Sequence, residues 1–189
     1  GRLLSVTSVD GTKVSYTYDA AGNLLTQTDG NKNRTSYAYN KAGLVISKTE
    51  GSGDAAVTQH YTYFGNGEVA TATDYAGTVT SYTYDSAGNL VKETSVSGSR
   101  SSTYTYVYDK ANRLVSFTDG SGTTTCAYDA LGRITEKRAP GFATVTFGYD
   151  MTAGCDAGFH YETETGETGT VKRWYDTAGR LVKVQSGTS

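Results

Sequence analysis

The stretch YTYDAAGNLLTQTDG, from Tyr16 to Gly30, has the pattern of a β-hairpin. Tyr16 and Tyr18 flank a threonine, and alternation with a period of two places both tyrosines on one face of a strand. The Asp-x-x-Gly that follows is typical of a tight turn, because an Asp side chain accepts hydrogen bonds from nearby N–H groups and Gly adopts positive φ at little cost. The residues from Leu24 onward are then expected to form the returning strand.

The same hairpin pattern recurs eight times, and an internal repeat decides the fold before any other feature. Tyr82–Val96 reads YTYDSAGNLVKETSV, and equivalent tyrosines follow one another at intervals of 20 to 26 residues. Asp follows the tyrosine in most copies, although Asn40 and Phe64 replace it in two of them. The predicted structural positions are Tyr18, Gly22, Tyr39, Gly43, Tyr63, Gly67, Tyr84, Gly88, Tyr108, Asn112, Tyr128, Gly132, Tyr149, Tyr175 and Gly179.

This pattern predicts an all-β protein of repeated antiparallel hairpins, about two strands per repeat, in a continuous curled or spiralling sheet. Residues 1–189 are expected to be one array of eight repeats plus a partial N-terminal one, because GRLLSV at Gly1 matches GRLVKV at Gly179. We expect the array to be a fragment of a larger protein. Its repeats should pair with neighbouring repeats of the same polypeptide, and its sheet edges should favour self-association.

The composition excludes several classes of partner. The chain is 37% hydrophobic, and its 17 basic and 19 acidic residues are interspersed, with a net charge of −2. Such a balance argues against nucleic acid as a partner, since nucleic-acid binding uses a basic face. No apolar run is long enough to predict a membrane span. The tyrosines are expected to pack between strands, with their hydroxyl groups left for water or a partner.

Few residues are candidates for catalysis, metal binding or a disulfide. Cys126 takes an aromatic position of its repeat and is interpreted as a small apolar residue, although a disulfide to Cys155 remains open. His60 is expected to be a solvated residue at a link. His160 lies in the irregular stretch GCDAGFHYETETGETG near Cys155, Asp156 and Glu162, but the spacing matches no ligand signature. We therefore predict no catalytic residue, no metal site, no cofactor and no enzymatic activity.

The ladder of tyrosines has two interpretations. Cross-strand packing explains its strict register without a ligand. Stacked aromatic rings also suit sugar rings, so a carbohydrate-binding or cell-wall-binding repeat module is the alternative function. No individual ligand-binding residue follows from the sequence.

The segments YTYDAAGNLL, YTYDSAGNLV, YVYDKANRLV, AYDALGRI and WYDTAGRLV resemble the YD repeat of Rhs proteins, which also occurs in Tc toxin complexes and teneurins. The resemblance implies a structural role, in which the repeats form part of a hollow β-shell. It implies that the shell of a bacterial toxin or surface protein encloses a toxic C-terminal segment, and that the protein is secreted or displayed at the cell surface. The D-P-x-G self-cleavage motif of such proteins is missing here, so the toxin and the cleavage site are expected elsewhere. The seventh copy departs from the pattern after GYDMTAG, which puts one hairpin in doubt.

Overall fold

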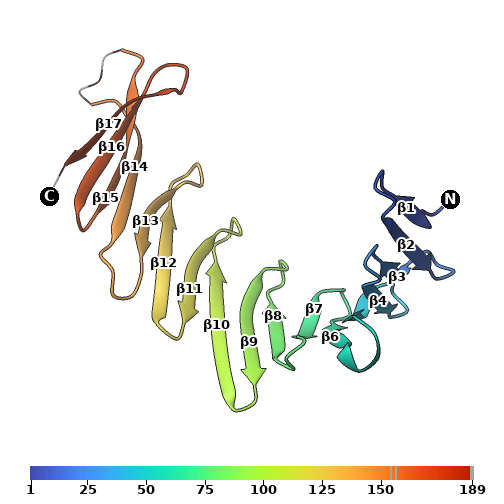
Figure 1. Cartoon of the computed structure of the whole chain (residues 1–189). Helices are drawn as coiled ribbons and strands as arrows, with labels where there is room; N and C mark the ends of the chain where they lie inside the picture. The colour runs from blue at the N-terminus through green and yellow to red at the C-terminus, as the bar shows by residue number, and fades with distance from the viewer. Residues whose placement is uncertain (154, 156, 188–189) are drawn as a thin grey trace. The chain divides into compact units, whose positions relative to one another are not determined.

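The computed structural model describes residues 1–153, 155 and 157–187, which form seventeen β-strands and one short 3-10 helix, η1 (Gly53–Ala55) (Figure 1). The all-β fold class predicted from the repeat is confirmed, and each hairpin contributes two strands. The strands are β1 (Ser5–Thr7), β2 (Lys13–Tyr18), β3 (Leu24–Thr28), β4 (Arg34–Tyr39), β5 (Val45–Glu50), β6 (Val57–Tyr63), β7 (Val69–Thr73), β8 (Val79–Tyr84), β9 (Leu90–Ser97), β10 (Arg100–Tyr108), β11 (Leu114–Asp119), β12 (Gly122–Tyr128), β13 (Ile134–Arg138), β14 (Val145–Met151), β15 (His160–Gly166), β16 (Gly169–Tyr175) and β17 (Leu181–Gly187).

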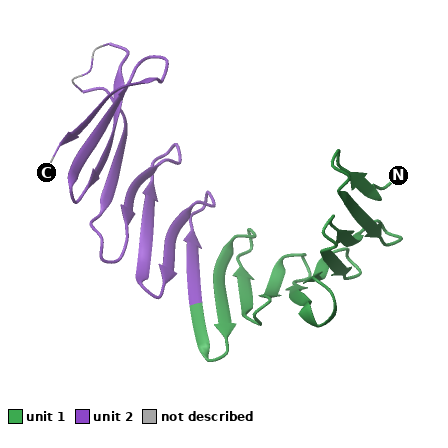
Figure 2. Cartoon of the chain, in the orientation of Figure 1, with its two compact units in different colours: residues 1–102 green, residues 103–189 purple. Residues whose placement is uncertain are grey.

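The strands divide into two compact units, residues 1–102 and residues 103–189 (Figure 2). In the first unit, strands β1 to β9 pair antiparallel in chain order. In the second unit, β10 to β17 pair in the same way. Each unit is therefore a meander, in which a strand meets the strands that precede and follow it in the sequence.

A bulge stands beside the tyrosine that ends the first strand of most hairpins. In the first hairpin Thr17 pairs with Thr26, whereas Tyr18 pairs with Leu24, so Leu25 is the extra residue. The register shifts in the same place before Tyr39, Tyr63, Tyr84, Tyr108, Tyr128 and Tyr175. A bulge at this position turns the returning strand so that the tyrosine faces the apolar residue that follows the turn.

The two faces of each sheet carry different side chains. On one face, the second tyrosine of the Tyr-x-Tyr lies opposite an apolar residue, as Tyr18 does opposite Leu24 and Tyr39 opposite Val45, whereas the first tyrosine lies opposite Gln27 or Lys48. On the other face, threonines pair across strands, as the hydroxyl groups of Thr62 and Thr71 do at 2.7 Å. The same contact joins Thr17 to Thr26 at 2.6 Å, Thr49 to Thr58 at 2.8 Å and Thr118 to Thr123 at 2.8 Å. The period-two pattern thus separates an aromatic face from a hydroxyl face, as the sequence predicted.

Neither face is covered by a second layer within the described residues. Tyr161 is the one hydrophobic side chain there that counts as buried, at 8% exposure, and no large side chain is fully buried. The accessible surface is 12453 Å², whereas a compact protein of this mass exposes about 8,700 Å². Since no deep core forms, contacts between adjacent strands and loops must provide most of the stability.

We expect this exposure to lower the dependence of the unfolding free energy on urea, because that slope follows the surface exposed on unfolding. With an unfolded surface of roughly 29,000 Å², the slope should be about a fifth smaller than for a compact protein of equal length. Urea titration of the dilute chain, followed by circular dichroism and by the fluorescence of Trp174, measures it. A slope equal to that of a compact control protein would contradict the single-layer description.

Candidate functional site: the clamp between repeats

The turn after each Tyr-Asp pair is built around the aspartate. Asp85 accepts hydrogen bonds at Oδ1 from the N–H groups of Ala87 at 2.8 Å and Asn89 at 2.9 Å. The Asn89 side chain donates to Oδ2 at 3.0 Å. The N–H of Asp85 donates to the carbonyl of Asn89, and that of Gly88 donates to the carbonyl of Asp85. One carboxylate and two main-chain hydrogen bonds therefore hold a loop that closes on the fourth residue ahead.

The same loop recurs in other copies, with asparagine or arginine after the glycine or, in one copy, after Asn112. Asn23 fills that position in the first hairpin and donates to Asp19. Arginine fills it in three others, where the guanidinium Nε donates to the aspartate Oδ2 at 2.7 Å from Arg113, 2.8 Å from Arg133 and 2.8 Å from Arg180. Asparagine and arginine share one function here, because both extend an N–H donor to the carboxylate four residues earlier. Sequence reasoning missed this role, although the restriction of the position to Asn or Arg in these copies was its signal.

These hydrogen bonds lower the pKa of the turn aspartates below the usual range. For Asp85 the largest cause is the bond from the Asn89 side chain, followed by the Asn89 main-chain N–H. For Asp129 the largest cause is the main-chain N–H of Arg133. The hydrogen bonds of the folded loop therefore stabilise the ionised form of the aspartate.

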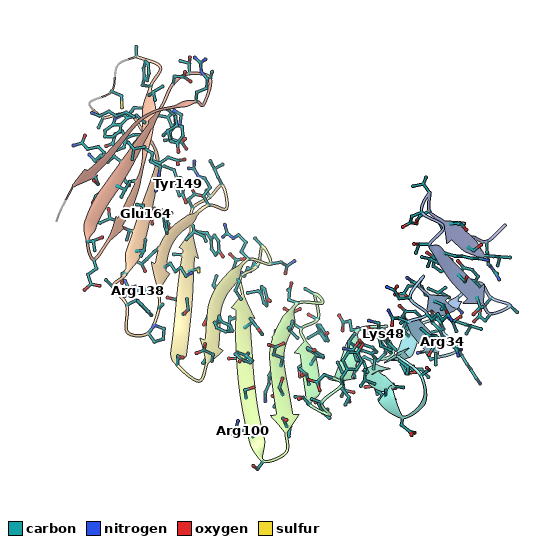
Figure 3. The ribbon with its side chains drawn as sticks, in the orientation of Figure 1. Arg34, Lys48, Arg100, Arg138, Tyr149 and Glu164 are labelled. Atoms are coloured by element: carbon teal, nitrogen blue, oxygen red, sulfur yellow. The ribbon has the colours of Figure 1, made fainter. Side chains whose placement is uncertain are left out.

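The tyrosine of the Tyr-Asp pair joins its hairpin to the preceding one. The hydroxyl of Tyr39 donates to the carbonyl of Leu24 at 2.8 Å, and that of Tyr128 donates to the carbonyl of Leu114 at 2.7 Å. Tyr18 and Tyr63 make the equivalent bond to the carbonyls of Leu3 and Val45. Tyr149, which is labelled in Figure 3, makes it to the carbonyl of Ile134. The prediction that these hydroxyl groups are left for water or a partner is therefore wrong. The bulge places a tyrosine close enough to reach a main-chain acceptor.

Where arginine occupies the fourth position after the aspartate, it strengthens the same junction. The Arg113 guanidinium lies 4.7 Å from the ring centre of Tyr128 and donates to the carbonyl of Asp129 at 3.0 Å. Arg133 lies 4.4 Å from the ring centre of Tyr149 and pairs with the carboxylate of Asp150. We call this arrangement the Tyr-Asp clamp: the tyrosine, the acceptor carbonyl of the preceding hairpin and, where present, the arginine of that hairpin. A cation over an aromatic face adds attraction to the hydrogen bonds.

Two copies show which parts of the loop are dispensable. Asn40 replaces the aspartate and still accepts the N–H groups of Ala42 and Leu44. Phe64 offers no acceptor, yet the main-chain bonds that close the loop remain, from Phe64 to Glu68 and from Gly67 to Phe64. The carboxylate therefore reinforces the loop, while the main chain defines it.

The seventh copy, which the sequence put in doubt, forms its hairpin with a longer loop. Strand β14 pairs with β15 through an irregularity between Gly148 and Met151. Asp150 has φ 52°, so the positive φ falls on the residue directly after the tyrosine instead of on the fourth residue after it. Tyr149 keeps its bond to the preceding hairpin.

The glycines at the predicted turn positions have the backbone conformation that their role requires. Gly22, Gly43, Gly67, Gly88, Gly132 and Gly179 have φ between 73° and 102°, and Asn112 has φ 58°. Residues with a Cβ rarely adopt this conformation, and asparagine is among those that do so most readily.

His60 and His160, the two histidines considered for catalysis or metal binding, lie on different strands, β6 and β15. His60 lies within strand β6, opposite Ser47 and Thr73 and exposed, so its expected place at a link is wrong. His160 stacks on Tyr175 with ring centres 5.3 Å apart. Glu162 accepts the Tyr175 hydroxyl at 3.3 Å.

Both cysteine thiols, at Cys126 and Cys155, are free, and Asp156 lies outside the described residues. In the described part of the chain no group of three or more His, Cys, Asp or Glu residues is arranged to hold a metal ion. Within the same part of the chain, no helix has the length and apolarity that crossing a membrane requires.

Comparison with known proteins agrees with this geometry. The family model described as RHS Repeat matches residues 1–34, 18–55, 63–100 and 108–141, which together make up more than half of the chain. The chain belongs to the RHS repeat family. A search of curated proteins gives no match.

Solved structures of Tc toxin proteins share the fold. The TcdB2-TccC3-Cdc42 crystal structure matches 98% of this chain with a TM-score of 0.64 at 16% identity, and TcdB2-TccC3 without its hypervariable C-terminal region matches 98% with a TM-score of 0.65 at 16% identity. The Tc holotoxin pore of Photorhabdus luminescens matches 96% with a TM-score of 0.63 at 19% identity. The chain spans 12%, 12% and 9% of those chains, respectively.

We expect Tyr39→Phe to destabilise the chain by about 1 kcal/mol, because it removes the hydroxyl that joins two hairpins and leaves the Leu24 carbonyl without that donor. Tyr37→Phe is the matched control on the same strand, since the described residues offer its hydroxyl no hydrogen-bond partner. Thermal and urea unfolding measure both variants. Equal stability of the two would show that the tyrosine contributes by packing alone.

We expect the folded chain to lose stability in acid, because the turn aspartates become protonated. A carboxylate whose pKa is lowered by folding contributes stability above its unfolded pKa of about 3.9, and that stability is lost as the pH falls through the lower pKa of the folded state. The melting temperature should therefore fall below about pH 4. Asp85→Asn should lower the melting temperature at pH 7 and reduce the further loss between pH 7 and pH 3. An unchanged loss in this variant would contradict the role of the Asp85 carboxylate.

The turn glycines should tolerate no branched side chain. Gly88→Val forces a β-branched residue into positive φ and should cost about 1–3 kcal/mol. Asn112→Gly should be tolerated or slightly stabilising, since glycine adopts the same φ without strain. Thermal melts of both variants measure this, and equal effects would mean that positive φ does not limit these positions.

Proposed function

We propose that this chain is a wall segment of a longer RHS-type toxin or surface protein, in which one array of eight repeats and a partial N-terminal repeat contributes to a shell around a C-terminal toxin. On this proposal the protein is exported and acts at the cell surface or outside the cell. The segment supplies enclosure and carries out no reaction of its own.

The observation that carries the proposal is the clamp repeated along a single-layer sheet. A single layer leaves both faces exposed, so it has little of the buried core that a self-sufficient domain needs. What recurs from copy to copy is the set of groups that join neighbouring hairpins. A structure whose repeated polar groups serve mainly to hold its own strands together suits a wall, and the likeness to the TcdB2-TccC3 structures supports this.

The polar groups that recur along the array have structural partners. The turn aspartates bind their own loops, and the tyrosine hydroxyls bind carbonyls of the preceding hairpin. Glu162 accepts a tyrosine hydroxyl in place of a carbonyl. This use of the polar residues favours a structural role over catalysis.

The proposal predicts that the wall fails when a repeat is removed. Deleting residues 64–84 from the full-length protein joins Tyr63 directly to Asp85, so the Tyr-Asp register continues with two strands fewer. Each repeat contacts mainly its neighbours, so the remaining hairpins should still fold. We expect limited proteolysis to degrade the downstream segment in the deletion variant and to spare it in the intact protein.

The matched control changes a link while leaving the strands in place. Residues 51–56 connect β5 to β6 and include η1, so replacing them with a flexible link of equal length should preserve protection. Protection that survives the deletion of residues 64–84 would overturn the proposal. So would loss of an activity of the isolated chain on Cys155→Ala or His160→Ala, because the irregular loop would then be a reactive site.

A further inference from the structure

A pocket open to solvent lies between the turn loops of the second hairpin, β4–β5, and the third hairpin, β6–β7. Its volume is about 630 Å³, which falls within the range of small-molecule sites, roughly 300–1,000 Å³. Leu44 and Ile46 line it from the second hairpin, and Tyr61, Tyr63 and Phe64 line it from the third. All of its lining residues are described, and none of them is charged.

The pocket coincides with two departures from the repeat. In the regular clamp an arginine covers the ring of the next tyrosine and donates to the main chain beyond it, as Arg113 does at Tyr128. Leu44 takes the position of that arginine in the second hairpin, and Phe64 takes the position of the aspartate in the third. Leu44 is shorter than arginine and has no cation to place over Tyr63. Apolar side chains therefore replace the charged groups of this junction, and the Tyr63 residue becomes part of the pocket wall.

The closure of its own loop does not explain Phe64. The loop closes through main-chain hydrogen bonds from Phe64 to Glu68 and from Gly67 to Phe64, which need no particular side chain. Phe64 is 45% exposed, and its ring packs edge-on against Tyr84 with ring centres 6.3 Å apart. Ile46, in the same pocket, is also exposed. Apolar side chains that gather at an exposed pocket are typical of a binding surface.

The lining favours an uncharged ligand that has both apolar and hydroxyl groups. Phosphate, sulfate and carboxylate groups would meet no cation among the lining residues, so nucleotides and acidic sugars fit poorly. Aromatic rings have a negative face, and the weakly positive C–H groups of a sugar ring can pack against it. Asn40 adds a polar group, because its Oδ1 accepts the N–H groups of Ala42 and Leu44 while its Nδ2 can donate to a hydroxyl oxygen.

We propose that this pocket binds a short stretch of a neutral glycan. A sugar ring packs on Tyr63 and Phe64, and a sugar hydroxyl accepts a hydrogen bond from Nδ2 of Asn40. The site depends on Leu44 and Phe64, which depart from the repeat, and so it differs from binding along the whole ladder of tyrosines. The inference goes beyond the proposed function and does not rest on it, because a wall segment can enclose a cargo with or without a glycan site.

Saturation-transfer NMR of the 189-residue chain with cellotriose, chitotriose and mannotriose, each at millimolar concentration, measures the binding. Trigalacturonic acid is the charged comparison. A proline decapeptide tests the other occupant that aromatic grooves favour, an extended proline-rich segment. We expect a neutral trisaccharide to bind and neither of the other two probes to do so. The proposal would be overturned if no neutral trisaccharide binds, if the acidic one binds equally well, or if the peptide binds in their place.

Two substitutions that restore residues of the regular repeat test the site without threatening the fold. Phe64→Asp removes an aromatic ring from the pocket, and Leu44→Arg places a long cationic side chain beside Tyr63. Each should lower the affinity for the trisaccharide about tenfold or more. Phe142→Asp is the matched control, because Phe142 is 79% exposed and lies outside the pocket, so binding should be unchanged. Far-UV circular dichroism and thermal melts check that all three variants fold.

The full-length protein separates this inference from the proposed function. Phe64→Asp should leave the downstream segment protected from protease, because the strands and the tyrosine hydrogen bonds stay in place. Trisaccharide binding that is unchanged in both Phe64→Asp and Leu44→Arg would overturn the glycan site. The protease experiment on the deletion of residues 64–84 tests the wall alone, so either idea can fail while the other stands.

Discussion

The hydrogen bond from a tyrosine hydroxyl to a main-chain carbonyl of the preceding hairpin is the contact on which the rest of this structure depends. A single-layer sheet buries little apolar surface, so the hydrophobic effect that holds most domains together contributes less here. Main-chain ladders join strand to strand along their length. The tyrosine adds a hydrogen bond at the loop end of the hairpin, where the bulge interrupts the ladder of main-chain hydrogen bonds. A tyrosine hydroxyl, with an ordinary pKa of about 10, is protonated and able to donate throughout the neutral range. Burial raises the pKa of Tyr39 and Tyr128 further.

The loop and the tyrosine depend on each other. Asp129 fixes the turn that follows Tyr128, and the carbonyl of the same aspartate accepts Arg113 from the hairpin before. A change in one hairpin therefore affects the junction with the next one, although each hairpin contacts only its neighbours. This coupling gives a repeat array its cooperativity without a shared core.

Much of this fold could be predicted from the sequence, because the determinants are local. The period-two alternation of Tyr16 and Tyr18, the Asp-x-x-Gly turn and their recurrence at regular intervals identified the strands, the aromatic face and the family. The partners of the side chains could not be predicted. That Tyr39 bonds to Leu24, or that Arg133 contacts the hairpin after its own, depends on which loops lie side by side once the bulges have formed. No local pattern encodes these pairings, and the tyrosine hydroxyls were accordingly expected to be free. The position of His60 inside a strand was missed for a related reason, since the start of a strand after an irregular link has no sharp signal.

The hydrogen bond of the tyrosine explains how a loop of this array can change length without loss of its strands. In the regular copies main-chain bonds close the turn on the fourth residue ahead, and they do so even where Phe64 supplies no carboxylate. In the seventh copy the fourth residue after the tyrosine is alanine instead of glycine, and the Asp150 carboxylate pairs with Arg133 of the hairpin before. Tyr149 still donates to the carbonyl of Ile134 and holds its strand in place. A surface loop after a Tyr-Asp pair can therefore diversify as long as the tyrosine keeps its carbonyl.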